Sequence, residues 1–212
     1  FITPPPGYFI RVSEILQRHG IPFISDEVQA GWGRTGVADF GFQAYGVEPD
    51  VVVFAKGLAN GVPIGGLIAT DDLASSIKSL SLSTFGGNPI ATTAALANLN
   101  YIATNHLREN ALAVGTYLHE RLRELQTKHP VIGDVRGLGL MQAIEFVTDP
   151  MSKDPATELT ARLHDEAKRR GLLVGKAGLY SNIFRLSPPL IISTSDVDDA
   201  IRILDESLIA VA

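Results

Sequence analysis

The chain of 212 residues contains no cysteine. This absence excludes disulfide bonds, zinc–thiolate sites, iron–sulfur clusters and a cysteine nucleophile, and it fits a reducing compartment. We therefore expect a cytoplasmic protein. Only 5 histidines occur, and their spacing is not that of metal ligands, so we expect no metal site.

Positive charge is also scarce, with 18 Lys and Arg against 23 Asp and Glu and a net charge of -5. Such a balance offers no general attraction for a polyanion, so we expect no nucleic-acid partner. The sequence has no apolar run of about 18 residues and no signal-peptide pattern, so we expect no membrane association. The chain begins with Phe1 and a proline-rich stretch, which favours a fragment of a longer protein.

The first part of the chain has the pattern of an α/β domain. Apolar residues at three- and four-residue intervals predict an amphipathic helix over residues 8–19. Short apolar runs predict strands over 21–25, 51–55 and 67–69, and the second is apolar throughout, as in a parallel strand covered on both faces. We expect a parallel sheet with helices packed on it.

The pattern changes along the rest of the chain. Asn88 and Pro89 predict the start of a long helical region that continues to about residue 129. The following part predicts strands over 138–147, 172–174 and 183–186, a helix over 157–170, and a last helix capped by Ser195. We therefore divide the chain into an α/β domain over residues 1–105 and a smaller α+β domain over residues 106–212.

Charged residues follow two of the predicted strands. Asp26 and Glu27 come after the first, and Lys56 comes after the second. Taken separately, the carboxylates could be metal ligands, an acid/base pair or solvated loop residues, and the lysine could simply extend into solvent. Together, an acid and a lysine at the ends of two strands can face one crevice, as a pyridoxal phosphate site requires.

Two glycine-containing stretches are candidate phosphate sites. The turn over residues 83–89 places a hydroxyl and two glycines before a helix start, which suits a phosphate but also an ordinary helix cap. Residues 31–36 match the dinucleotide pattern G-x-G-x-x-G. Five residues separate this match from the strand, and the segment after it makes a poor crossover helix, so the context disfavours a nicotinamide cofactor.

Two arginines lie in the second part of the chain. Arg185 sits within an apolar strand and could bind a substrate carboxylate through both of its terminal nitrogens, or pair with a local acid. Arg136 has the same ambiguity, and its flanking residues favour a structural role.

Several motifs together resemble the class III pyridoxal phosphate-dependent aminotransferases. They begin with Ser25-Asp26-Glu27-Val28-Gln29 and the glycine-rich loop that follows, and they cover essentially the whole chain. The resemblance is greatest to the alanine–glyoxylate branch. The other matching stretches are Phe54-Ala55-Lys56-Gly57, Thr84-Phe85-Gly86-Gly87-Asn88-Pro89, Gly133 to Met141, Gly171 to Gly175, and Phe184 to Pro189.

The resemblance implies fold type I, with part of the large parallel-sheet domain and the small C-terminal α+β domain. It implies pyridoxal phosphate as cofactor, Lys56 as the Schiff-base lysine and Asp26 as the partner of the pyridine nitrogen. It further implies that Val28 packs on the ring and Gln29 bonds its phenolic oxygen.

Substrate and partner contacts are implied in the same way. The resemblance implies that Thr84 reaches the phosphate of the neighbouring subunit's cofactor in a homodimer, and that Arg185 holds the substrate carboxylate. Family members carry a further stretch of comparable length before the equivalent of Phe1, which includes a glycine/serine phosphate loop and an aromatic residue stacking on the ring. On this resemblance the chain is the C-terminal part of the enzyme, with only part of the cofactor site.

The expected reaction moves an amino group from an amine or amino acid to a keto acid such as pyruvate or glyoxylate. Two alternatives stay open at this point. One is a non-catalytic fragment or paralogue that keeps the fold for dimerisation. The other is a lyase, racemase or decarboxylase, because the same lysine and acid serve those reactions.

Overall fold

The computed structural model describes residues 1–211, and these form two compact units. The N-terminal unit comprises Pro4–Glu109. The C-terminal unit begins at Asn110 and also includes Phe1–Thr3. The sequence predicts one domain over residues 1–105, whereas the structure groups Phe1–Thr3 with the C-terminal residues. One reason is a hydrogen bond of 2.6 Å from Arg136 Nε to the carbonyl oxygen of Phe1.

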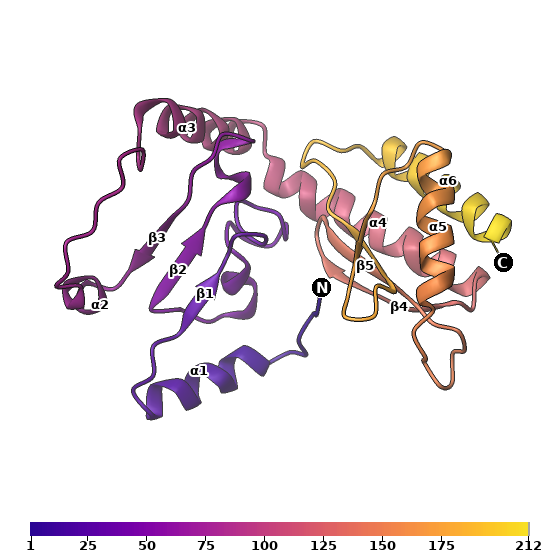
Figure 1. Cartoon of the computed structure of the whole chain (residues 1–212), viewed down its shortest axis with the longest axis horizontal. Coiled ribbons are helices and arrows are strands. Elements are labelled where there is room, and N and C mark those ends of the chain that lie inside the picture. Colours follow the sequence, from indigo (N-terminus) through magenta and orange to yellow (C-terminus); the bar gives the residue numbers. More distant parts are fainter. Residues whose placement is uncertain (212) are drawn as a thin grey trace. The chain divides into compact units, whose positions relative to one another are not determined.

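The N-terminal unit combines helices with a small sheet (Figure 1). Its elements are α1 (Tyr8–Arg18), β1 (Ile24–Asp26), the 3-10 helix η1 (Gly41–Tyr45), β2 (Val51–Phe54), the 3-10 helix η2 (Lys56–Ala59), β3 (Gly66–Ala69), α2 (Asp71–Ser76) and α3 (Pro89–Thr104). The predicted helix over 8–19 is confirmed. As predicted, Asn88 caps α3, because its side chain accepts a hydrogen bond from the backbone N–H of Ala91.

The sheet of this unit has the order β1-β2-β3. The strands β1 and β2 are parallel, with Asp26 opposite Val53, as predicted for these two strands. The third strand is antiparallel to β2, so a fully parallel sheet is wrong for β3. The connection over residues 55–65 explains this difference, because a parallel return would need a crossover of about a dozen residues or more.

A buried carboxylate fixes the loop that follows β1. Glu27 is only 3% exposed. Its Oε2 accepts a hydrogen bond of 2.7 Å from the N–H of Gly41, and its Oε1 accepts bonds from the N–H of Phe42 at 2.8 Å and from Ser25 Oγ at 2.9 Å. A side chain at residue 41 would also crowd this carboxylate and Ala30. Glu27 therefore ties the end of β1 to the start of η1.

The long helical region expected after Pro89 consists of two helices. After α3, a break at Asn105 and His106 separates it from α4 (Leu107–Lys128). His106 has a φ of 52°, which no helical residue adopts, so the chain changes direction there. The other elements that follow are β4 (Ile132–Leu138), β5 (Met141–Phe146), α5 (Thr157–Arg169), β6 (Gly175–Ala177), β7 (Ile183–Leu186) and α6 (Thr194–Val211).

The sheet of the C-terminal unit has the order β4-β5-β7-β6, and all its neighbouring strands are antiparallel. The strand predicted over 183–186 is confirmed as β7. The strand predicted over 138–147 is confirmed as β5, whereas β4 was not predicted, and the strand predicted over 172–174 lies later, at β6. Ser193, not Ser195, caps α6, because Ser193 Oγ accepts a hydrogen bond from the N–H of Asp196.

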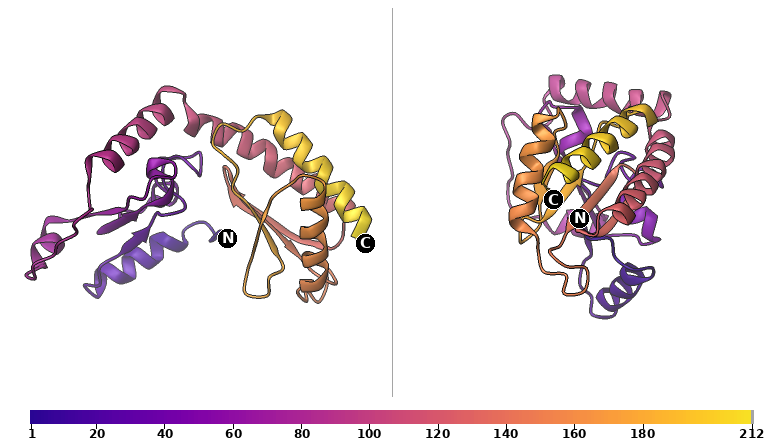
Figure 2. Two further views of the ribbon diagram at one scale, coloured as in Figure 1. Left: turned by 45° about the horizontal axis from the view of Figure 1, so that its top comes forward. Right: turned by 90° about the vertical axis from the view of Figure 1, so that its right-hand side faces the viewer.

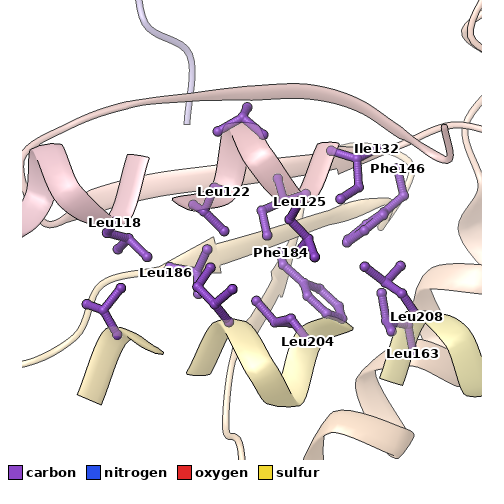
Figure 3. Packing of buried hydrophobic residues seen from close by; sticks show 14 of the residues in the cluster. Leu118, Leu122, Leu125, Ile132, Phe146, Leu163, Phe184, Leu186, Leu204 and Leu208 are labelled. Atoms are coloured by element: carbon purple, nitrogen blue, oxygen red, sulfur yellow. The ribbon is translucent and has the colours of Figure 1, made fainter. Parts of the chain in front are cut away.

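Three helices share the core of the C-terminal unit with one face of its sheet. Figures 1 and 2 show α4 and α6 side by side, and ion pairs such as Lys128 with Asp205 join them. Leucines at helical spacing on α4 meet Phe184 of β7 and the apolar stripe of α6 (Figure 3). None of the helices found in residues 1–211 has the length and apolar character needed to cross a bilayer.

Leu122 lies at the centre of this core with no exposed surface. We expect Leu122→Ala to lower the free energy of unfolding by about 2–5 kcal/mol, because it removes packed methyl groups and leaves a cavity. Urea unfolding followed by circular dichroism measures the change. Leu112→Ala is the matched control, since Leu112 lies on the same helix but is 46% exposed, and we expect it to change stability little. Equal losses in the two variants would contradict this description of the core.

We expect Glu27→Gln to lower the free energy of unfolding by about 1–3 kcal/mol, because an amide nitrogen would then face backbone donors that now bond a carboxylate oxygen. Chemical unfolding of the variant and the parent gives the difference. Glu48→Gln serves as control, because Glu48 is an exposed carboxylate of the same unit. An unchanged midpoint for Glu27→Gln would mean that the loop does not depend on these bonds.

Candidate active site

Asp26 and Lys56 lie at the same edge of the N-terminal sheet. Asp26 ends β1, and Lys56 follows β2 after a single residue. Because the two strands are parallel and adjacent, their carboxyl ends meet at one edge. Both side chains are exposed, so this edge presents a carboxylate and an amine to a ligand. Asp26 Oδ1 also accepts a hydrogen bond of 3.0 Å from the N–H of Val28, which orients the carboxyl group.

The backbone at Lys56 has an unusual conformation. Lys56 begins η2 with a φ of 44°, and Asn60 ends the turn with a φ of 47°. Non-glycine residues rarely adopt this left-handed conformation, and they hold it only where the surroundings enforce it. Leu58 and Ala59 supply that constraint, because they are 6% and 3% exposed and pack against Ala95 of α3. Lys56 is thus exposed on a turn whose next residues are buried.

The glycine-rich match over residues 31–36 lies in consecutive turns and does not open an α-helix. This geometry agrees with the prediction that it is no dinucleotide site, because that site needs a helix start after the glycines. The loop instead carries Trp32, whose ring lies 5.5 Å from that of Phe54 and beside Gly57.

Trp32 is itself strained, with a φ of 62°. Its Nε1 and the Oγ1 of Thr35 are buried without a hydrogen-bond partner among residues 1–211. No role was predicted for Trp32 from the sequence. The feature that could have indicated one is its position as the single tryptophan of the chain, between two glycines and close in sequence to the candidate acid.

Three other predicted cofactor residues belong to the same unit. Val28 is half-buried and Gln29 is exposed, and both lie in the turns that follow β1. Thr84 lies in an exposed segment between α2 and α3, some distance along the chain from the two strand ends. The roles of all three remain predictions.

Arg185 and Arg136 lie in one row across the sheet of the C-terminal unit. Arg136 is opposite Ala143, and Ala143 is opposite Arg185, so the two arginine side chains share a face. Phe184 points to the opposite face, where the helices cover it. The face that carries the arginines is therefore the one away from the helices.

The two arginines have different surroundings. Arg136 Nη1 forms ion pairs of 2.7 Å with both Asp134 and Glu145, and these acids hold its pKa above the usual value although burial opposes the shift. This pairing confirms the structural role favoured for Arg136. Arg185 is exposed, and its guanidinium lies 5.8 Å from the centre of the Phe1 ring.

A cavity of about 400 Å³ lies at the end of β7 and includes Arg185 in its wall. Leu118, Val174 and Leu186 contribute apolar surface, and Ser187 contributes a hydroxyl. The wall also includes Asp196 and Val197 of α6, so it extends onto the helix-covered side of the sheet, opposite the face that carries the arginines.

The groups at the N-terminal sheet edge fit pyridoxal phosphate by their chemistry. The primary amine of Lys56 can bond the aldehyde carbon of this cofactor, and the carboxylate of Asp26 can hold a proton on a pyridine nitrogen. Both groups are exposed in the part of the chain that the structure describes. No cluster of three or more His, Asp or Glu side chains suited to a metal ion occurs in residues 1–211.

Known proteins resemble this chain over nearly its whole length. Alanine–glyoxylate aminotransferase 2 homolog 2, a mitochondrial protein of Arabidopsis thaliana, is 45% identical over 204 residues, which are 96% of this chain and 43% of that protein. An aminotransferase from Bacillus anthracis superposes with a TM-score of 0.93 at 36% identity, covering 99% of this chain and 49% of that one. A phospholyase from Arthrobacter in complex with phosphoethanolamine superposes with a TM-score of 0.94 at 34% identity. The match covers 99% of this chain and 50% of that one.

The chain thus spans about half the length of the relatives it matches. The structural likeness confirms the expected fold type I, and the relative from Arabidopsis agrees with the expected alanine–glyoxylate branch. A family model described as Aminotransferase class-III matches residues 1–208. This chain therefore belongs to the class-III aminotransferases, a family that uses pyridoxal phosphate.

Proposed function

We propose that the protein is an aminotransferase that moves an amino group from an amine or amino acid to a keto acid such as pyruvate or glyoxylate. The observation that carries this proposal is the pair of exposed side chains, Asp26 and Lys56, at the carboxyl ends of two adjacent parallel strands. Membership of the class-III family and the name of the Arabidopsis relative support the same activity.

In this proposal Lys56 and Asp26 perform the central chemistry. Bound pyridoxal phosphate supplies an electron sink for the carbon that bears the amino group. Lys56 Nζ would hold the cofactor, and the same amine would take a proton from the carbon that bears the amino group and would later return one. Asp26 keeps a proton on the ring nitrogen by charge attraction.

The remaining predicted contacts complete the proposed site. Val28 packs against the cofactor ring, and Gln29 bonds its phenolic oxygen. The hydroxyl of Thr84 bonds the phosphate bound to the other subunit of a homodimer. Exposed apolar residues around Thr84 support a subunit contact, since Leu82 is 89% and Phe85 is 82% exposed.

The proposal also extends to domains and location. Residues 1–105 form part of the large cofactor-binding domain, and residues 106–212 form the small domain. The absence of cysteine favours a reducing compartment such as the cytoplasm.

We expect the Lys56→Ala variant of the complete gene product to lose transamination while keeping its fold, because it removes both the covalent anchor and the proton carrier. Asp26→Asn should keep cofactor binding and lose about 100-fold or more in rate, the scale of a positioned proton-holding group. The turnover rate with pyruvate or glyoxylate as acceptor measures the effect of each of the two substitutions. Lys78→Ala and Asp72→Asn, exposed residues of the same unit, are the controls.

Borohydride reduction with pyridoxal phosphate, followed by mass mapping of peptides, locates the covalent site directly. The proposal requires the adduct on Lys56, and a Lys56→Ala enzyme with near-normal turnover would contradict it. Release of product without a keto acid would instead identify a lyase, and the absence of any adduct would support a non-catalytic protein.

We propose that Arg185 binds the carboxylate of the keto acid. Arg185→Ala should raise the KM for a keto acid by roughly 10–100-fold, because hydrogen bonds to a charged group are lost. The KM for an aldehyde acceptor, which has no carboxylate, should change little. Arg162→Ala is the control, because Arg162 is exposed on α5 of the same unit. Equal losses for the two acceptors would assign Arg185 a role other than carboxylate binding.

A further inference from the structure

The turn that carries Lys56 is held by a side chain from far along the chain. Asn98 of α3 donates through Nδ2 to the carbonyl oxygen of Gly57 at 2.8 Å and to that of Leu58 at 3.0 Å. These carbonyl groups belong to the two residues that directly follow Lys56. α3 packs directly against η2, so the amide reaches both carbonyls from a rigid helix.

The turn needs this support because of its own geometry. A four-residue 3-10 helix leaves most of its carbonyl groups without internal partners. The backbone bond to the Gly57 carbonyl, from the N–H of Asn60, is long at 3.5 Å. Lys56 and Asn60 both have positive φ, so the turn is strained at its two ends. The Asn98 amide supplies two short bonds between these strained positions.

The orientation of the Asn98 amide is determined by its partners. Carbonyl oxygens only accept hydrogen bonds, so the amide must present its nitrogen to them. Burial of Leu58 and Ala59 against Ala95 holds the apolar side of the same turn. The Asn98 bonds therefore act on the carbonyl groups of the turn. Rotation of these peptide groups would move Lys56.

We propose that Asn98 is a positioning residue for Lys56, and that its two hydrogen bonds hold the lysine turn in the conformation that directs the amine towards the carboxyl edge of the sheet. The inference rests on the proposed function, since it assumes that Lys56 is the residue that bonds the cofactor. The Nδ2 group of Asn98 bonds two carbonyl groups of the turn. Its effect on the amine is transmitted through the backbone.

Two substitutions test this role. Asn98→Leu keeps the size of the side chain and removes the donor, and Asn98→Asp places carboxylate oxygens against the two carbonyls. Asn100→Leu and Asn100→Asp are matched controls, because Asn100 lies two residues further along α3 and is exposed. Circular dichroism of each complete gene product establishes that it folds.

The main readout is the affinity for pyridoxal phosphate, measured from the absorbance of the lysine adduct. We expect both Asn98 variants to bind about tenfold more weakly, on the scale of two lost hydrogen bonds, and both Asn100 variants to bind as the parent does. Reductive methylation of the cofactor-free protein by formaldehyde gives the intrinsic reactivity of Lys56, with Lys78 as internal standard. We expect the methylation rate of Lys56 to be the same in the Asn98 variants and the parent, because the Asn98 hydrogen bonds alter the position of the amine and not its chemistry.

The outcomes separate the two proposals. If the parent protein forms no adduct on Lys56, the proposed function fails and the role of Asn98 fails with it. If the parent forms the adduct and both Asn98 variants bind the cofactor as tightly, only the positioning role is overturned. A lower melting temperature with unchanged cofactor affinity would likewise assign Asn98 a purely structural role.

Discussion

Parallel hydrogen bonding between β1 and β2 is the constraint on which the candidate active site depends. It places Asp26 opposite Val53 and so brings the ends of both strands to one edge of the sheet. The pairing continues one step beyond β1, because the N–H of Glu27 donates to the carbonyl oxygen of Val53 at 2.8 Å. The carboxylate of Glu27 then turns inward to the start of η1, while Asp26 remains exposed. Two adjacent acids therefore have opposite functions, one structural and one available to a ligand.

In the C-terminal unit, the sheet carries an exposed arginine, Arg185, on strand β7. Alternation along β7 sends Phe184 into the helical core and Arg185 to the opposite face. Arg136 lies on the same face but is held by Asp134 and Glu145. These acids neutralise the charge of Arg136 and account for its structural role, whereas the Arg185 guanidinium lies 5.8 Å from the centre of the Phe1 ring. The sequence of each strand alone could not separate them, because the partner acid Glu145 comes from the neighbouring strand.

Much of the fold and the candidate site could be predicted from local patterns, and the failures have physical causes. The strand that contains Arg185 and the helix over residues 8–19 follow from apolar periodicity, and the candidate pair Asp26 and Lys56 follows from their places after apolar runs. The strand β4 was missed because a register shift between Ile132 and Asp134 interrupts the alternation, and because Gly133 and Gly137 carry no side chains that could show it. The strand β6 was misplaced because pairing with β7, and not the apolar run before it, decides where it begins. The helix break at His106 was missed because helical spacing continues on both sides of it.

Three positions whose conformation local patterns could not predict lie around Lys56. Trp32, Lys56 and Asn60 all adopt positive φ without being glycine, and all three belong to the lysine turn or to the loop packed beside it. Such conformations have an energetic cost, so other contacts must offset it. The burial of Leu58 and Ala59 and the amide of Asn98 provide those contacts. Asn98 lies about forty residues from the turn in sequence, so only the packing of α3 against η2 shows its connection with the lysine. The strained turn and the helix α3 that stabilises it therefore act together. In this arrangement the position of the Lys56 amine depends on residues that need not contact a ligand.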